Sequence, residues 1–208
     1  MSTPATRKPA SERREEILAA AAVEFAETGL AGTRLEVIAA RADISHPRIV
    51  QMFGTKRALF LAVIESIFDR IETAFTVAAP GAAGHDTPAL IALGSAYRQL
   101  LERDRAVGLV MLQGYAGAAD DEVRQLVSRR YRQLQRTVTA LTGADARAMR
   151  SFFATGLVFT VSTVLELPDR RVDTDWAGWL LAQSDLQHTE EQVRQSEEMM
   201  KDHRAPSP

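Results

Sequence analysis

The side chains best suited to chemistry gather in one short stretch, within the sequence TRLEVIAARADISHPRIVQMFGTKRALF at residues 33–60. Helical periodicity over this stretch places four of them on one outward face: His46, Arg48, Gln51 and Met52. Arginine can donate two hydrogen bonds to guanine, and glutamine can exchange two with adenine. The face therefore has the chemistry to read base edges in a DNA major groove. A short alanine-rich helical hairpin without a role in DNA binding would give a similar pattern.

Several short helices must hold this face in place. The sequence predicts a first helix from residue 11 that stops at Gly29, a second capped by Thr33, and a third capped by Ser45 with Pro47 in its first turn. Thr55 is predicted to cap a long fourth helix. Helices of seven or eight residues are unstable alone in water, so the second and third must be held by packing. Two such helices joined by a tight turn form a helix-turn-helix.

The rest of the chain also has helical periodicity, and strand-like alternation is absent at useful length. We expect an all-α fold of about nine helices. The expected domains are a disordered arm at 1–10, a helix-turn-helix domain at 11–54, a larger helical domain at 55–183 and a polar tail at 184–208.

Local signals mark the ends of the later helices. Thr87 and Pro88 are predicted to open the fifth helix, and a break near residues 102–105 separates it from the sixth. Asp120 is predicted to cap the seventh helix, which Gly143 ends, and Asp145 begins the eighth.

The eighth helix is apolar nearly all round between Phe152 and Leu165. This is more apolar surface than a helix with one solvent-exposed face usually carries. The small residues Ala154 and Gly156 would let another helix approach closely. A ninth helix is predicted around Trp176. This excess of apolar side chains predicts either a second helical partner or a fully buried core within one chain.

Composition and charge exclude several classes of protein. The chain has 208 residues, a net charge of −2 and no cysteine, so disulfides and thiolate ligands are excluded. Its four histidines are scattered and no P-loop or nucleophile-elbow motif is present, so we expect no enzyme, catalytic residue, metal or resident cofactor. No apolar run reaches the roughly 18 residues of a membrane span, and we expect a cytoplasmic protein without membrane partners.

The segment at residues 33–60, together with ILAAAAVEFAETG at 17–29, resembles the DNA-binding segment of the tetracycline-repressor (TetR) family over roughly residues 12–64. The resemblance implies a homodimeric transcriptional regulator of double-stranded DNA, usually a repressor released by a small-molecule effector. It also implies that the last two long helices, eight and nine, form the dimer interface. The alternative is an all-helical small-molecule-binding protein or enzyme without a DNA function.

The resemblance implies roles for individual positions. Thr33 and Lys56 would contact phosphates. The full set of expected DNA contacts is Thr33, Arg34, Ser45, His46, Pro47, Arg48, Gln51, Met52 and Lys56. The chain departs from the family pattern at Asp43, where glycine is usual, and at Val50 and Met52, where aromatic residues or histidine are common. Aspartate tolerates the left-handed region that this turn needs, and Val50 is expected to pack rather than to touch a thymine methyl.

An effector pocket is expected between helices four and eight, where an apolar cavity would carry a few polar groups. The candidate residues are Tyr97, Met111, Gln113, Tyr115, Phe152, Phe153 and Thr160. They indicate a moderately hydrophobic, partly aromatic molecule, although each could equally be plain core. Four arginines expected on the outer face of the seventh helix, Arg124, Arg129, Arg132 and Arg136, suggest a second nucleic-acid surface or, alternatively, a solvated face.

Overall fold

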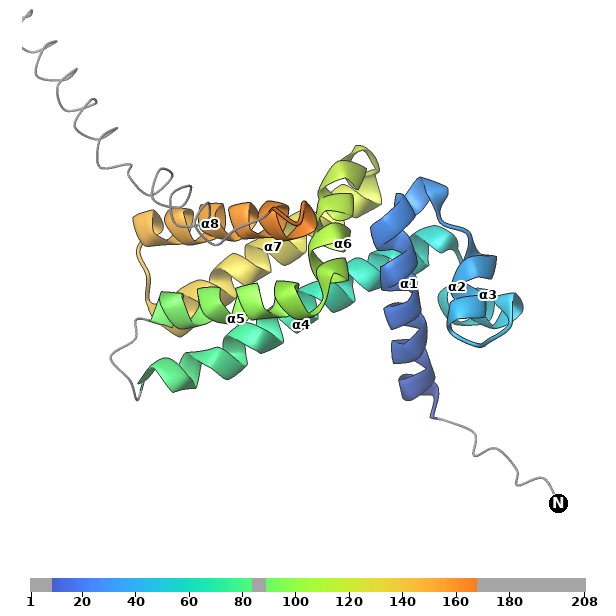
Figure 1. The fold of residues 1–208 in the computed structure, drawn as a ribbon, viewed down its shortest axis with the longest axis horizontal. Helices are drawn as coiled ribbons and strands as arrows, with labels where there is room; N and C mark the ends of the chain where they lie inside the picture. Colours follow the sequence, from blue (N-terminus) through green and yellow to red (C-terminus); the bar gives the residue numbers. More distant parts are fainter. Residues whose placement is uncertain (1–8, 84–88, 168–208) are drawn as a thin grey trace, which may run out of the picture. The chain divides into compact units, whose positions relative to one another are not determined.

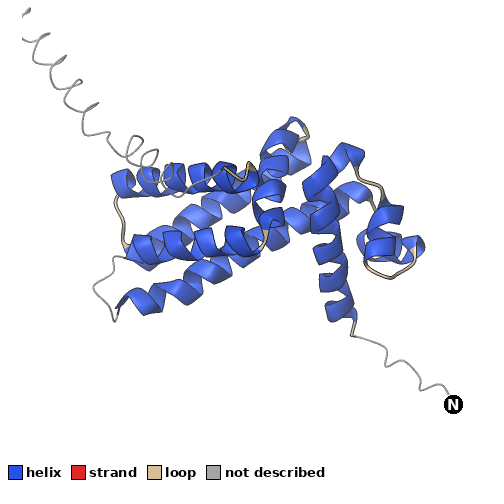
Figure 2. Ribbon diagram, viewed as in Figure 1, coloured by secondary structure: helices blue, strands red, loops and turns tan. Residues whose placement is uncertain are grey.

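The computed structural model describes residues 9–83 and 89–167, which form eight α-helices and one short 3-10 helix, with no strand among them (Figures 1 and 2). The prediction of an all-α fold is confirmed. The helices are α1 (Ala10–Gly32), α2 (Leu35–Arg41), α3 (His46–Phe53), α4 (Lys56–Ala83), α5 (Ala89–Arg103), α6 (Arg105–Ala116), η1 (Gly117–Ala119), α7 (Asp121–Thr142) and α8 (Ala146–Val164). The predicted ninth helix, the polar tail, most of the arm, and Thr87 and Pro88 lie outside the described residues.

The helix-turn-helix unit is held by apolar side chains that each helix contributes to a shared core. Ile17 and Phe25 of α1, Ile38 of α2 and Ile49 of α3 are all buried. Phe60, near the start of α4, meets Phe25 edge to face with ring centroids 4.9 Å apart. Packing of this kind supplies the stability that helices of seven and eight residues lack by themselves.

The turn between α2 and α3 and the end of α1 both use left-handed backbone. Asp43 has φ 51°, so aspartate does adopt the conformation expected of it there. Gly29 has φ 66° and ψ −178°, which interrupts α1 at the predicted stop, and one further turn runs on to Gly32. The bend at Gly29 directs the chain toward α2.

Thr33 does not cap α2, so that prediction was wrong. The N-cap position belongs to Arg34, which makes no side-chain capping bond. The Thr33 side chain turns inward instead, only 3% exposed, and its hydroxyl donates to the carbonyl of Gly29 at 2.6 Å. The kink at Gly29 brings that carbonyl within reach, and Thr33 therefore closes the end of α1.

The larger part of the described chain is built around α4. In Figure 1 α1–α3 lie beside the first turns of α4, and α5 and α7 pack along its later part. Its apolar face is buried almost completely, from Leu59 through Ile67 to Phe75. The sixth helix contacts both α1 and α8. Because α4 packs against both the helix-turn-helix and the later helices, a displacement of α4 would also displace the helix-turn-helix.

Most predicted helix ends are confirmed. The Asp120 carboxylate accepts from the backbone N–H groups of Glu122 and Val123, and that of Asp145 accepts from Ala148. Gly143 ends α7 with φ 64°. The predicted break before α6 falls at Asp104, which caps that helix. These signals are local to a few residues, so they can be found without knowledge of the tertiary structure.

Thr55 and Ser45 give a matched pair for testing a cap. The Thr55 hydroxyl accepts from the N–H of Ala58 at 3.0 Å, whereas Ser45 occupies the cap position of α3 without a side-chain capping bond. We expect Thr55→Ala to lower the free energy of unfolding by about 1 kcal/mol. Ser45→Ala should change it by much less. Urea unfolding of the two variants measures the difference, and equal losses would contradict it.

The apolar excess of α8 is partly exposed. Leu157 is 50% exposed, Val161 37% and Leu165 61%, and these positions lie on one face of the helix. The other side of α8 packs against α5 and α6. The part of the chain that the structure describes therefore does not bury this face, which favours a helical partner over a fully buried core.

Candidate nucleic-acid interface

The outward face of α3 carries most of the expected DNA contacts. Gln51, Ser45 and Pro47 are exposed, His46 and Arg48 are half-buried, and Arg34 is exposed at the start of α2. Met52 is half-buried and packs against the core, so it is the least available of the expected base contacts. Apart from Arg34, these residues lie on α3 or at its N-cap.

Val50 was expected to pack, and that expectation was wrong. Its side chain is 41% exposed. Ile49 is the residue of α3 that is fully buried, and one step along the helix turns Val50 by about 100° away from it. The interface therefore includes an apolar side chain that could touch a thymine methyl group.

Arg48 and Gln51 are already bonded to each other. The Arg48 guanidinium donates to the Gln51 side-chain oxygen at 2.6 Å, across the i,i+3 spacing of a helix. While that bond lasts, Gln51 cannot use the same oxygen lone pair to accept from adenine. Arg48 keeps further N–H groups free for a guanine. The pair acts as one unit in which glutamine orients arginine.

An acidic residue lies beside this face. Glu36 of α2 has a carboxylate oxygen 3.6 Å from Nδ1 of His46; the Glu36 side chain is exposed and that of His46 is half-buried. The contact is an ion pair only when His46 is protonated. Protonation of His46 would therefore add a positive charge to the face and pair it with Glu36.

Lys56 has an anchoring role that was not expected. Its ammonium donates to the carbonyls of Thr33 at 2.8 Å and Ala31 at 3.2 Å, which ties the first residue of α4 to the connection between α1 and α2. An ammonium has three donors, so one is left for a phosphate. Of the two residues expected at phosphates, Lys56 remains available, whereas the Thr33 hydroxyl is buried.

Long-range ion pairs join α2 to α1 and α4 to α7, and no local sequence pattern predicts them. The Arg41 side chain of α2 donates to the buried Glu24 carboxylate of α1 at 2.6 Å. Arg57, the second residue of α4, pairs with Asp120, the N-cap of α7, at 3.0 Å. These pairs link elements that are 17 and 63 residues apart in sequence. Only the fold brings them together.

The expected effector residues separate into two groups. Tyr97 of α5 and Thr160 of α8 share a hydrogen bond between their hydroxyls at 2.7 Å. Phe75 connects Tyr97 to Phe152 through edge-to-face contacts, and Phe153 follows at 5.5 Å from Phe152. Sequence reasoning missed Phe75 and also Tyr131, whose ring lies 5.3 Å from that of Phe153. Helical spacing by itself gives neither residue a role beyond packing.

Gln113 has a different neighbour. A Cβ atom on Gly29 would lie 2.7 Å from the Gln113 side-chain oxygen, so this amide rests against the kink of α1. Met111 is buried in the core, with 6% of its surface exposed. Among the expected effector residues, Gln113 therefore contacts the DNA-binding part of the chain.

Burial raises the pKa of two tyrosines among the expected effector residues. Desolvation raises the pKa of Tyr97 and, more strongly, that of Tyr115 above the usual range of a phenol. Both hydroxyls stay neutral at physiological pH and can donate hydrogen bonds. The hydroxyls of Tyr97 and Thr160 are therefore neutral polar groups beside the rings of Phe75 and Phe152.

None of the described helices is both long and apolar enough to cross a membrane. Within the same part of the chain, no three potential metal-ligating side chains come together.

Comparison with known proteins matches the helix-turn-helix region. Residues 17–63 fit the model of the family of bacterial regulatory proteins called tetR. The chain is 41% identical over 59 residues to the HTH-type transcriptional regulator RutR of Escherichia coli (strain K12). That alignment covers 28% of this chain and 28% of RutR, so it spans under a third of the curated relative.

Solved structures extend the likeness to most of the fold. A TetR-like transcriptional regulator from Rhodococcus sp. RHA1 is similar with a TM-score of 0.64 and 22% identity, covering 86% of this chain and 98% of that one. The transcriptional regulator FadR of Bacillus subtilis, in complex with stearoyl-CoA, is similar with a TM-score of 0.64 and 17% identity, covering 80% of this chain and 96% of that one. At these identities the likeness establishes the fold.

Proposed function

We propose that this chain, whose residues 17–63 match the model of the tetR family of bacterial regulatory proteins, is a member of that family and a sequence-specific DNA-binding transcriptional regulator. The proposal rests on the outward face of α3. It presents Arg48, Gln51 and Val50, whose donors, acceptor and apolar surface match those of base edges in a major groove. The buried core beneath α3 makes that face rigid enough to read sequence.

Regulators with a helix-turn-helix commonly bind as dimers. Two copies would present their α3 helices to successive turns of the major groove, with half-sites about 34–36 Å apart, or a multiple of that spacing. The operator would then be a near-palindrome. The exposed apolar face of α8 supports α8 as part of the homodimer interface, because a partner would remove it from water.

The dimer can be tested by placing a charge on α8. We expect Leu157→Glu to raise the dissociation constant of the dimer about tenfold or more, because the substitution would bury a carboxylate in an apolar interface. Sedimentation across a concentration series measures this. Ile91→Glu is the matched control, since Ile91 is 57% exposed on α5. Identical sedimentation of both variants and the unsubstituted protein would exclude this face.

An effector is the remaining part of the proposal. We place a small hydrophobic or aromatic molecule among the helices that carry Tyr97, Phe152 and Thr160. The neutral tyrosine hydroxyls and the surrounding aromatic rings support this class of ligand. The stearoyl-CoA complex of FadR supports it as well, since that regulator has the same fold. The effector would release DNA only by binding one arrangement of the two α3 helices more tightly than another.

Selection of bound sequences from a random pool of duplex DNA tests the proposal directly. Recovery of an inverted repeat at near-physiological salt is the expected result. The alternative, a helical small-molecule-binding protein or enzyme without a DNA function, predicts no enriched sequence. It also predicts that any activity survives Arg48→Ala, a substitution that should reduce the affinity of a regulator for its operator.

A further inference from the structure

Positive charge is concentrated in the hairpin of α7 and α8. The hairpin, residues 121–164, contains seven arginines and three carboxylates, those of Asp121, Glu122 and Asp145, although the whole chain has a net charge of −2. All seven arginines lie on α7 or in the first turns of α8. A local excess of this size attracts anions.

Only part of this charge is neutralised. Arg130 is buried and pairs with Asp69 of α4 at 2.6 Å, with Glu72 3.6 Å away, and Arg124 pairs with Asp121 at 2.6 Å. The other five have no carboxylate within 4.0 Å in the part of the chain that the structure describes, and three of them lie on α7: Arg129, Arg132 and Arg136. Their spacing of three and four residues places them on one side of α7. We name them the α7 arginine face.

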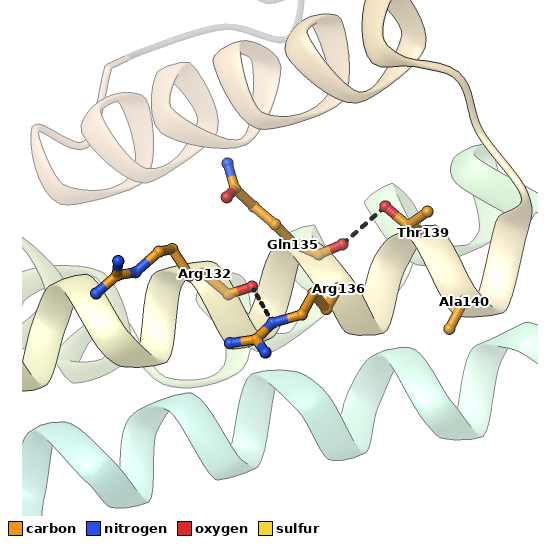
Figure 3. A pocket seen from close by; sticks show the side chains of 5 residues that line it. All are labelled: Arg132, Gln135, Arg136, Thr139 and Ala140. Atoms are coloured by element: carbon orange, nitrogen blue, oxygen red, sulfur yellow. Dashed lines mark hydrogen bonds between the residues drawn. The ribbon is translucent and has the colours of Figure 1, made fainter.

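The backbone anchors two of these side chains. Nε of Arg132 donates to the carbonyl of Ser128 at 3.1 Å, and Nε of Arg136 donates to that of Arg132 at 3.3 Å. Figure 3 shows Arg132 and Arg136 in a surface hollow that is also lined by Gln135, Thr139 and Ala140. Because Nε is the anchored atom, the terminal nitrogens of each guanidinium remain free to donate. Gln135 lines the same hollow, with its amide pointing away from the Arg136 guanidinium in Figure 3.

The hollow is well separated from the base-reading helix. Gln133 donates to Glu72 at 3.2 Å, which sets this level of α7 beside residue 72 of α4. Residue 72 is about 24 Å along α4 from Lys56, at 1.5 Å per residue. The α7 arginine face itself is about 10 Å long on the same measure. A duplex bound by α3 would leave the α7 arginine face exposed. The length of that face suits a few phosphate oxygens.

We propose that the α7 arginine face binds the phosphate groups of a small phosphate-bearing molecule. Guanidinium forks form paired, charge-assisted hydrogen bonds with phosphate oxygens, which suits two anchored arginines four residues apart. The bound anion would also relieve the repulsion between neighbouring arginines on one helix face. The site is separate from the DNA interface and does not depend on it.

Titration calorimetry of the full chain with inorganic pyrophosphate, in a low-salt buffer without phosphate, tests the site. The expected result is saturable binding with one pyrophosphate per chain, weakened at least tenfold in the double variant Arg132→Gln/Arg136→Gln. The matched control is Arg98→Gln/Arg103→Gln, which removes the same charge from α5 and should bind as tightly as the unsubstituted protein. Thermal unfolding of both variants checks that they fold.

Three results would overturn the proposal. Equal weakening in both double variants would mean diffuse attraction by net charge. No saturable binding by the unsubstituted protein would mean a solvated arginine face. Binding of a non-operator duplex that falls only in the α7 variant, without pyrophosphate binding, would assign the face to nucleic acid instead.

Discussion

Gly29→Ala is expected to lower the free energy of unfolding by about 2–3 kcal/mol. The backbone at Gly29, with φ 66° and ψ −178°, lies in a region open almost only to glycine, and a side chain there costs about 1–3 kcal/mol. The added Cβ would also lie 2.7 Å from the Gln113 side-chain oxygen. That oxygen ends a flexible side chain, so the steric part should be the smaller one.

A double variant separates the two causes. Adding Gln113→Ala to Gly29→Ala removes the atom that the new Cβ would meet and leaves the backbone strain in place. We therefore expect it to restore no more than about 1 kcal/mol, the usual scale of a displaced rotamer. Full restoration would mean that the backbone at residue 29 relaxes and that the steric contact dominates.

Gly94→Ala is the control for this measurement. Gly94 lies within α5, and a Cβ there would meet its nearest neighbour, in Phe152, at an ordinary 3.9 Å. Alanine is a better helix former than glycine, so we expect a gain of about 0.5–1 kcal/mol. Urea unfolding of the three variants gives the comparison. A loss at Gly94 as large as that at Gly29 would contradict this account.

The same glycine connects stability to the DNA interface. Its carbonyl accepts from both the backbone N–H and the hydroxyl of Thr33, at 3.2 and 2.6 Å. The Thr33 carbonyl in turn accepts from Lys56. A strained residue 29 would therefore displace the start of α2, and operator affinity should fall along with stability. Gln113 gives α6 a direct contact with this position.

Features fixed by a few neighbouring residues could be predicted from the sequence. The caps at Thr55, Asp120 and Asp145 each need one polar side chain and the N–H groups that follow it. The turn at Asp43 needs only a residue that tolerates positive φ. The all-α fold follows from the helical periodicity of the sequence, and the described residues contain no strand.

Thr33 shows where local reasoning fails. A threonine before a short apolar helix is typical of an N-cap, yet its hydroxyl bonds to the Gly29 carbonyl that the kink brings close. Val50 and Gln113 show the same limit, because a helical pattern defines faces without saying which neighbour each face meets. Arg130 is the buried one among the five arginines of α7. The sequence pattern does not distinguish it from the others, because its partner Asp69 is 61 residues away.

Arg48→Ala is expected to cost about 1–3 kcal/mol of binding free energy on the best operator, a loss of roughly 5- to 150-fold in affinity. The loss should be specific to sequence. One base position per half-site should become tolerant, because the guanidinium that reads it is gone. Competition binding against single-base operator variants measures both effects.

The bond between Arg48 and Gln51 leads to a further prediction about which base the pair reads. Since Gln51 holds the guanidinium through its side-chain oxygen, the base read by the pair should be guanine, and Gln51→Ala should weaken binding at the same position as Arg48→Ala. The double variant should then lose little more than Arg48→Ala alone. Independent losses at two different positions would mean that glutamine reads its own base once DNA is bound.

Lys56→Ala is the contrasting variant. Its ammonium reaches backbone carbonyls and has one donor left for a phosphate, so its removal should weaken operator and non-operator DNA alike. The slope of log affinity against log salt should fall by about one. Equal losses for Arg48→Ala and Lys56→Ala on every sequence would mean that α3 contributes charge without reading bases.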